Sequence, residues 1–390
     1  MKQKNSFSGQ IGFVFAAAGS AVGVGNLWRF PYLAAKDGGG LFLIIYLALV
    51  LTVGFVLLTT DIAIGRKTGK SAIYAYESMR KKWKFLGVIT FLVPVLIMTY
   101  YAVIGGWILR YIVIYLTSSG KQAVADDCFT AFISSPSSVW YGLIFMLLTA
   151  LIVYNGVEEG IERVSKFIMP VLLIMVIGIA IFSLTLKTTL DDGTVRTGLQ
   201  GLKVYMKPDL TGITVGRFLQ ITLDAMSQLF FSLSVSMGIM ITYGSYVKKD
   251  VDLNKAVSQI EIMDTGVAFL AGVMIIPAVF VFSGLDGMSA GPGLMFVSLP
   301  KVFYSMGTVG RVIGILFFVL AGFAALTSCI SVLESITANC MELFHTERKK
   351  TTRVLSVIYL IATAVIALGY SIFYVCLLYT SPSPRDYAAS

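Results

Sequence analysis

Gly19-Ser20-Ala21-Val22-Gly23-Val24-Gly25 stands in the middle of the first long apolar segment of the chain, and Asn26 and Arg29 follow directly. Three glycines in seven residues disfavour a continuous helix, because each costs about 1 kcal/mol relative to alanine. In hydrocarbon, every opened peptide group also needs a new partner, so a break is tolerated where it lines a cavity or contacts a ligand. The stretch therefore predicts a binding site for an ionic or polar ligand inside a membrane.

The composition is that of a membrane protein. Of 390 residues, 57% are hydrophobic and only 13% are charged, and the mean hydropathy is +0.83. A membrane-spanning helix needs about 20 apolar residues. Hydropathy predicts nine spans, at residues 10–35, 41–65, 86–116, 139–155, 164–187, 216–246, 255–284, 307–343 and 353–376. The first is too long and too interrupted by polar residues to be a cleavable signal peptide.

The net charge of +9 is concentrated in basic clusters between spans, which argues against a nucleic-acid partner. Clusters lie at residues 2–4, 66–84, 248–249 and 348–353. All four face the cytoplasm if the N-terminus is cytoplasmic, as the positive-inside rule requires. Short loops and the lack of paired outer cysteines favour a plasma (inner) membrane, with the lipid bilayer as the main partner.

A second interruption, Ser-Leu-Ser-Val-Ser-Met-Gly at 232–238, falls in span six. Interrupted spans at corresponding positions of two halves are typical of transporters built from inverted repeats. We therefore expect an all-α membrane domain at 1–377, with a first five-helix repeat at about 10–187 and an incomplete second at about 216–377. Segment 285–306 is expected to form an outer hairpin, and residues 378–390 a disordered or unrelated tail.

Several polar residues inside spans have two interpretations each. Asp264 is a candidate site residue, since an unpaired carboxylate is costly in a membrane. The glycines could instead serve helix packing, and Thr327 and Ser328 could bond their own helix. Asp61 and Glu334 are expected to be structural, whereas the role of Glu261 stays open.

This ordered set of motifs resembles the neurotransmitter:sodium symporter family, including its bacterial amino-acid members. The resemblance covers roughly residues 9–374. It rests on the following stretches: 19–32 (GSAVGVGNLWRFPY), 38–40 (GGG), Tyr100-Tyr101, 228–234 (QLFFSLS), 241–246 (ITYGSY) and 325–328 (ALTS).

The resemblance implies two sodium sites. The first would use the Ala21 carbonyl, Asn26, Ser232, Asp264 and the carboxylate of the substrate. The second would use the carbonyls of Gly19, Val22 and Ala324 and the hydroxyls of Thr327 and Ser328.

The resemblance also implies contacts with an amino-acid substrate. Its carboxylate would meet Val24, Gly25 and Tyr101. Its amino group would face carbonyls of Ser20, Phe231 and Ser234, with Ser232 and Ser328 nearby. Ile97, Phe231, Met237 and Val332 would line the side-chain pocket. Arg29 and Phe231 would form an outer gate, and Lys4 and Glu342 an inner one.

The chain departs from the family pattern in three places. Family members usually have eleven or twelve helices. The acidic partner of Arg29 in a tenth helix is missing here, and the sequence leaves open whether this chain itself transports. Phe7 and Gln10 stand where an N-terminal Trp and Arg are usual. Ala268 stands where chloride-dependent relatives have serine, and Asp264 supplies a fixed charge one turn away, so chloride is expected not to be required.

The favoured function is sodium-coupled symport of a neutral amino acid, of the hydrophobic or aromatic class, by alternating access, by a monomer or a homodimer. One alternative is a sensor or channel on the same fold, which would bind ligand without sodium-driven accumulation. Another is a membrane enzyme using Asp61, Glu261 and Asp264, but the sequence offers no clear acid–base pair, and the single histidine, His345, lies at a helix end.

Overall fold

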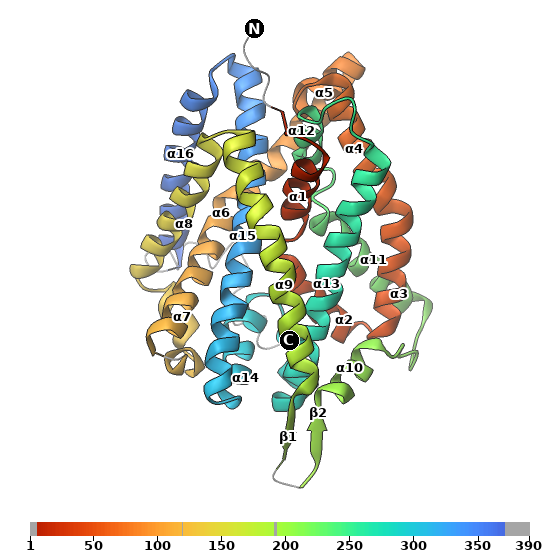
Figure 1. Cartoon of the computed structure of the whole chain (residues 1–390), viewed down its shortest axis with the longest axis vertical. Helices are drawn as coiled ribbons and strands as arrows, with labels where there is room; N and C mark the ends of the chain where they lie inside the picture. Colours follow the sequence, from red (N-terminus) through yellow and green to blue (C-terminus); the bar gives the residue numbers. More distant parts are fainter. Residues whose placement is uncertain (1–5, 119, 191–192, 371–390) are drawn as a thin grey trace.

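The first apolar segment folds as two helices, α1 (Gln10–Ala21) and α2 (Val24–Lys36), which meet at a bend of 53°. The computed structural model describes residues 6–118, 120–190 and 193–370 (Figure 1). The last amide of α1 that bonds in helical fashion is that of Val22, which donates to the Ala18 carbonyl at 2.7 Å. Gly23 is extended, with φ −111° and ψ −176°. The predicted break therefore lies at Val22–Gly23.

The second predicted break is also present. Span six consists of α11 (Val215–Ser232), a non-helical stretch at 233–238, and the short α12 (Ile239–Ser245). Ser234, Ser236 and Gly238 all have positive φ angles, of 52°, 61° and 73°. Such angles are uncommon for residues other than glycine, so this stretch is held open by its surroundings.

The remaining long elements form a bundle of helices around α1, α2, α11 and α12 (Figure 1). Their bounds are α3 (Gly40–Leu49), α4 (Phe55–Thr68), α6 (Lys84–Ser118), α8 (Ser137–Tyr154), α9 (Arg163–Thr185), α13 (Leu253–Ser283), α15 (Thr308–Phe344) and α16 (Arg348–Gly369). π-Helical turns join α3 to α4 and precede α9, at η1 (Val50–Gly54) and η4 (Val157–Glu162).

Within the described residues, seven helices are long and apolar enough to cross a membrane, or eight if α1 and α2 form one bent span. Of the nine predicted spans, only the sixth fails this test. The reason is its division into α11 and the seven-residue α12, which leaves no continuous apolar helix. The last predicted span begins as α16, and its end at 371–376 lies outside the described residues, as do Lys4 and the tail at 378–390.

The connections at the two ends of the bundle differ in character. One end carries α5 (Ala72–Met79), η2 (Lys81–Trp83) and α12 (Figure 1). The opposite end carries short elements in segments that the sequence predicts to be connections between spans. These are η3 (Lys121–Val124), α7 (Cys128–Ile133), β1 (Lys187–Thr189), β2 (Val195–Thr197), α10 (Gly198–Met206), η5 (Leu285–Gly287), η6 (Leu294–Ser298) and α14 (Leu299–Ser305).

The two strands pair antiparallel, with Lys187 opposite Thr197. The Gly/Pro-rich segment 285–306 folds as η5, η6 and α14, and Phe296 in η6 packs among aromatic rings. It stacks on Phe129 at a ring-centroid distance of 4.9 Å and meets Trp28 of α2 at 6.4 Å. These contacts place segment 285–306 against α2, the second half of the broken first span.

Glycines bring α12 directly against α4. A Cβ at Gly65 would lie 1.9 Å from the Ile241 carbonyl oxygen, and one at Gly244 would lie 2.3 Å from the Ile62 carbonyl oxygen. Small residues at such crossings let membrane helices approach closely. The glycine at position 65 therefore fixes where α12, and with it the end of the second break, sits in the bundle.

The Gly65→Ala substitution should destabilise the protein by about 2 kcal/mol, because the added methyl group overlaps backbone and two helices must separate. The midpoint of thermal unfolding in detergent measures the effect. Gly178→Ala in α9 is the matched control, since nothing lies within 4 Å of its added Cβ, and helix propensity makes it neutral or slightly stabilising. Equal midpoints for the two variants would contradict this account of the α4–α12 contact.

Candidate functional site

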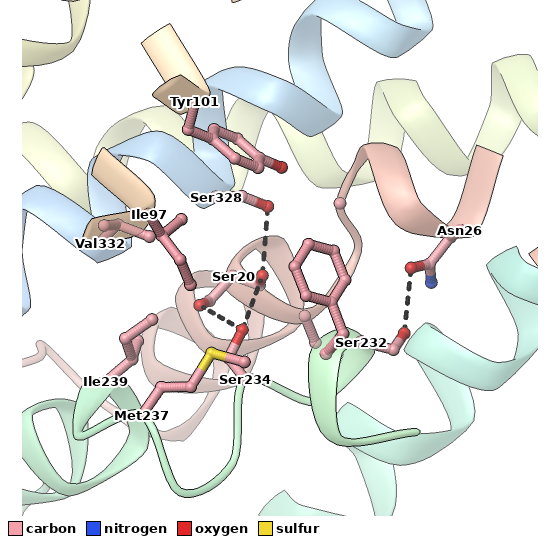
Figure 2. Close-up of a pocket in the computed structure, with 13 residues that line it drawn as sticks. Ser20, Asn26, Ile97, Tyr101, Ser232, Ser234, Met237, Ile239, Ser328 and Val332 are labelled. Carbon is pink, nitrogen blue, oxygen red and sulfur yellow. Dashed lines mark hydrogen bonds between the residues drawn. The ribbon is translucent and has the colours of Figure 1, made fainter. Parts of the chain in front are cut away.

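Both helix breaks open onto one small enclosed cavity at the centre of the bundle (Figure 2). About 30 Å³ of it is accessible to the centre of a water molecule, which is room for roughly two waters. Its walls come from α1, α2, α6, the end of α11, the stretch 233–238, the start of α12, and α15. The lining residues are Ser20, Ala21, Gly23, Asn26, Ile97, Tyr101, Phe231, Ser232, Ser234, Met237, Ile239, Ser328 and Val332. All the residues predicted to contact substrate line it except Val24 and Gly25.

Asn26, Ser232 and Asp264 meet on one side of this cavity, although they are far apart in sequence. The Asn26 side-chain amide donates to Asp264 Oδ1 at 2.7 Å. The Ser232 hydroxyl lies 3.0 Å from Asn26 Oδ1 and 2.9 Å from each carboxylate oxygen of Asp264. All three side chains are almost completely buried. The first predicted sodium group is therefore brought together by α2, α11 and α13.

The Asp264 carboxylate has no basic partner within the described part of the chain. Asn26 and Ser232 offer it neutral donors only, and its exposed fraction is 0%. A buried carboxylate without an opposite charge is unfavourable by several kcal/mol. Hard oxygen atoms at this spacing are the donors that alkali and alkaline-earth ions prefer. The arrangement can hold a small cation.

A second oxygen-rich group lies where the end of α1 packs on α15. A Cβ at Gly19 would stand 3.2 Å from Thr327 Cβ. The Ser328 hydroxyl donates to the Ser20 carbonyl at 3.2 Å. The Thr327 hydroxyl donates to the carbonyls of its own helix, 3.0 Å from that of Phe323 and 3.2 Å from that of Ala324. This back-bonding uses the hydroxyl proton and leaves lone pairs of Thr327 Oγ1 available to a cation.

Gly23 and Gly25 give the opened backbone its access to the cavity. A Cβ at Gly23 would lie 3.1 Å from the Ser328 hydroxyl and 3.3 Å from the Tyr101 hydroxyl, and one at Gly25 would lie 2.9 Å from the Phe231 ring. The Tyr101 hydroxyl is within hydrogen-bonding reach of the Val24 backbone and of Ser328. The first amides of a helix have no acceptor one turn back in the helix, so the N-terminus of α2 is a favourable place for an anionic group.

The stretch 233–238 is held from both sides. The Ser234 hydroxyl contacts the Ser20 carbonyl at 3.3 Å and the Ser20 hydroxyl at 3.4 Å, which joins the two helix breaks (Figure 2). On the other side, Asp61 of α4 accepts a hydrogen bond from the Ser236 amide at 2.8 Å. Asp61 therefore has the structural role that the sequence suggested, since it satisfies a backbone donor freed by the opened helix.

Charged residues connect α2, the second half of the broken first span, with α11, the first half of the broken sixth span. Arg29 donates to the Ser227 hydroxyl of α11 at 2.9 Å. At the end of α2, Lys36 forms an ion pair with Asp224 at 3.0 Å. The next residue, the fully buried Asp37, forms an ion pair with Arg217 at 2.9 Å. Ser227, not named by the sequence analysis, is thus the partner that the structure gives to the predicted gate residue Arg29.

At the opposite end of the bundle, Glu342 accepts hydrogen bonds from the Ser71 amide at 3.0 Å and the Ser71 hydroxyl at 2.6 Å. Its predicted partner Lys4 lies outside the described residues, so that pair stays a prediction. Glu334 forms a buried bidentate ion pair with Arg348 at 2.6 Å and accepts from Tyr246 at 2.6 Å. This agrees with a structural role for Glu334.

Gly23 and Ile239 line the cavity but were not predicted as substrate contacts. Gly23 stands within the glycine-rich stretch 19–25, from which the first break was predicted. Ile239 begins α12 directly after the break, and its position beside Met237 is the signal that could have found it.

The acids of the enzyme hypothesis do not share the cavity. Asp61 binds Ser236, Asp264 faces Asn26, and Glu261 packs near Gly54, where a Cβ would be 3.3 Å from its Oε1.

Comparison with known proteins gives a consistent result. The sequence matches the Sodium:neurotransmitter symporter family over residues 4–141 and 128–381. It is 38% identical to the uncharacterised sodium-dependent transporter YhdH of Bacillus subtilis, over 88% of this chain and 74% of the relative. It is 32% identical to an uncharacterised sodium-dependent transporter of Methanocaldococcus jannaschii, over 95% of this chain and 77% of the relative.

Among solved structures, MhsT in complex with L-phenylalanine superposes with a TM-score of 0.82 at 36% identity. The match covers 98% of this chain and 84% of MhsT. The expected fold, an all-α inverted-repeat transporter with discontinuous first and sixth helices, is thereby confirmed.

Replacing Asp61 by alanine should destabilise the protein by about 2 kcal/mol, because the buried Ser236 amide loses its acceptor. Asp61→Asn is the matched variant, since its side-chain oxygen can still accept from that amide. Thermal unfolding in detergent should therefore rank wild type and Asp61→Asn close together and well above Asp61→Ala. If asparagine were as damaging as alanine, the Asp61–Ser236 hydrogen bond would not be what stabilises the stretch 233–238.

Proposed function

The chain belongs to the sodium:neurotransmitter symporter family, and from that premise we propose that it carries a neutral amino acid across the plasma membrane together with sodium. Its relatives are named as sodium-dependent transporters. The observation that carries the proposal is the buried Asp264 carboxylate, which faces Asn26 and Ser232 but no basic residue of the described chain. A sodium ion at this point supplies the missing positive charge.

Two sodium ions are proposed. The first binds at Asn26, Ser232, Asp264 and the Ala21 carbonyl. The second binds between α1 and α15, at Thr327, Ser328 and the carbonyls of Gly19, Val22 and Ala324. The short Gly19–Thr327 approach supports the second site, because it brings the last carbonyls of α1 next to two hydroxyls.

The substrate is proposed to be a hydrophobic or aromatic L-amino acid. Its carboxylate would lie between the free amides of α2 and the Tyr101 hydroxyl, and next to the first sodium. Its side chain would face Ile97, Phe231, Met237, Ile239 and Val332. No charged residue lines the cavity, which favours a neutral side chain, and the flexible Met237 can shift to admit bulk.

Coupling follows from shared contacts. If the substrate carboxylate completes the coordination of the first sodium, each ligand raises the affinity of the other by the same factor. Because Asp264 supplies a fixed negative charge at this place, chloride is not needed to balance the ions. A channel or sensor on the same fold would bind the amino acid but would not accumulate it.

The proposed orientation places α5, α12 and the start of α16 in the cytoplasm. The basic clusters at 66–84, 248–249 and 348–353 all lie at this end of the bundle (Figure 1). That asymmetry is what the positive-inside rule expects of a cytoplasmic face. Alternating access would then involve the first repeat, at about 10–187, and the second, from about 216, moving around the two breaks.

Reconstituted into liposomes, the protein should accumulate labelled phenylalanine or leucine when an inward sodium gradient is imposed, and not when sodium is replaced by potassium. Uptake should be unchanged when gluconate replaces chloride. Asp264→Ala should abolish sodium-dependent binding, since it removes the charge that attracts the ion. Sodium-dependent binding of phenylalanine without any accumulation would favour the sensor, and a strict need for chloride would refute the charge argument.

Thr327→Val should raise the sodium concentration for half-maximal phenylalanine binding roughly tenfold, because one oxygen ligand of the second site is lost. Thr337→Val is a matched control. Thr337 lies in the same helix, is equally buried and also bonds its own helix, to the Leu333 carbonyl at 2.8 Å. If both variants shifted the sodium dependence alike, the effect would belong to α15 packing and not to a sodium ligand.

A further inference from the structure

A groove of about 440 Å³ lies between β2, α10 and the end of α13, well away from the central cavity. Figure 1 places α10 beside β2 at the end of the bundle that also carries α14. The lining residues that matter here are Val195 and Arg196 of β2, Gln200 and Lys203 of α10, Lys207 just after α10, and Phe280 of α13.

Three cationic side chains give this groove its charge. Neither Arg196 nor Lys203 forms an ion pair with a carboxylate in the described ranges. The Arg196 guanidinium lies 5.8 Å from the centre of the Phe280 ring, which holds it at the groove wall. Hydrogen bonds with Thr211 and the nearby charge of Lys207 lower the pKa of the Asp209 carboxyl, so Lys207 is shared with that acid. Among the described residues, Arg196 and Lys203 therefore have no carboxylate as an ion-pair partner.

Helix α10 has one face on the protein and one apolar face away from it. Gly201 approaches α13 so closely that a Cβ would lie 2.6 Å from Pro277 Cα, and Tyr205 donates to the Phe269 carbonyl at 3.1 Å. On the other side, Leu199 and Met206 are 63% and 45% exposed. Helix α13 is apolar and long enough to span a membrane, so its end is expected near a membrane interface. Helix α10 lies along the C-terminal half of α13, from Phe269 to Pro277.

An exposed apolar stripe beside unpaired cations is the pattern of a helix lying in the headgroup region. Lysine and arginine there keep their charged ends at the phosphate level while their aliphatic parts contact apolar surface. A free inorganic anion would use the cations but would leave Leu199 and Met206 without a role. A phospholipid uses both.

We propose that the groove formed by β2, α10 and the end of α13 binds the headgroup phosphate of an anionic phospholipid, with Arg196 and Lys203 as the principal contacts. The acyl chains run along Leu199 and Met206. The site is independent of the transport cycle proposed above, so its test needs neither sodium nor amino acid.

Native mass spectrometry of the detergent-solubilised protein tests the proposal. Phosphatidylglycerol and phosphatidylcholine with the same acyl chains are titrated separately. Wild type should retain phosphatidylglycerol in preference to phosphatidylcholine, and the Arg196→Gln, Lys203→Gln double variant should lose roughly tenfold of its phosphatidylglycerol affinity, since each basic residue near an anionic lipid contributes appreciably.

The matched control is the Lys121→Gln, Lys187→Gln double variant. It removes the same charge from the same end of the bundle, outside the groove lining, and should keep the wild-type preference. Equal loss in both double variants would reduce the effect to net charge and overturn the site. Displacement of phosphatidylglycerol by an excess of inorganic phosphate alone would overturn the lipid assignment in favour of a free-anion site. Thermal unfolding midpoints within a degree or so of wild type would establish that both double variants are folded.

Discussion

A carboxylate buried without a counter-charge is the constraint on which the centre of this protein depends. Asp264 is 0% exposed, and the hydrogen bonds that its carboxylate accepts within the described residues come from the neutral Asn26 and Ser232. The Ser232 hydroxyl has a single proton, yet three acceptor oxygens lie within 3.0 Å of it. It can donate to one of them at a time, so the group as a whole has an excess of electron-rich oxygens. An arrangement of this kind is stable in a membrane when a cation joins it.

The two helix breaks depend on the polar side chains around them, because these side chains form hydrogen bonds with the opened backbone. Opened helices expose carbonyls and amides that hydrocarbon does not tolerate. In this chain Ser234 is held against Ser20, Ser236 against Asp61, and Ser328 against the Ser20 carbonyl. These side chains hold the backbone open at a defined width. A site made in this way depends on the packing of several helices. The tolerance at the contact between α4 and α12 is narrow, since a methyl group added at Gly65 would overlap the backbone of α12.

The sequence predicted the two breaks from glycine and serine clusters in apolar spans, and the adjacent Asn26 and Arg29 favoured a binding role over helix packing. It also predicted which residues gather, but through the family resemblance, since spacing alone does not bring Asn26 to Asp264 across 238 positions. Ser227 and Ile239 escaped notice, because their roles depend on which neighbour the folded chain provides. Helix α10 was treated as a connection, although Thr197 and Gln200 form a capping box there, a signal that the sequence does contain.

The paired charges between α2 and α11 have a mechanical consequence. Lys36 is tied to Asp224, Asp37 to Arg217, and Arg29 to Ser227, so three links join the two half-helices along one side. Half-helices connected in this manner resist separation, and we expect them to move together. Any bending is then concentrated at residues 22–23 and 233–238, where hydrogen bonds of the helices are already missing. The connected pair can keep its form while the chain bends at these two places.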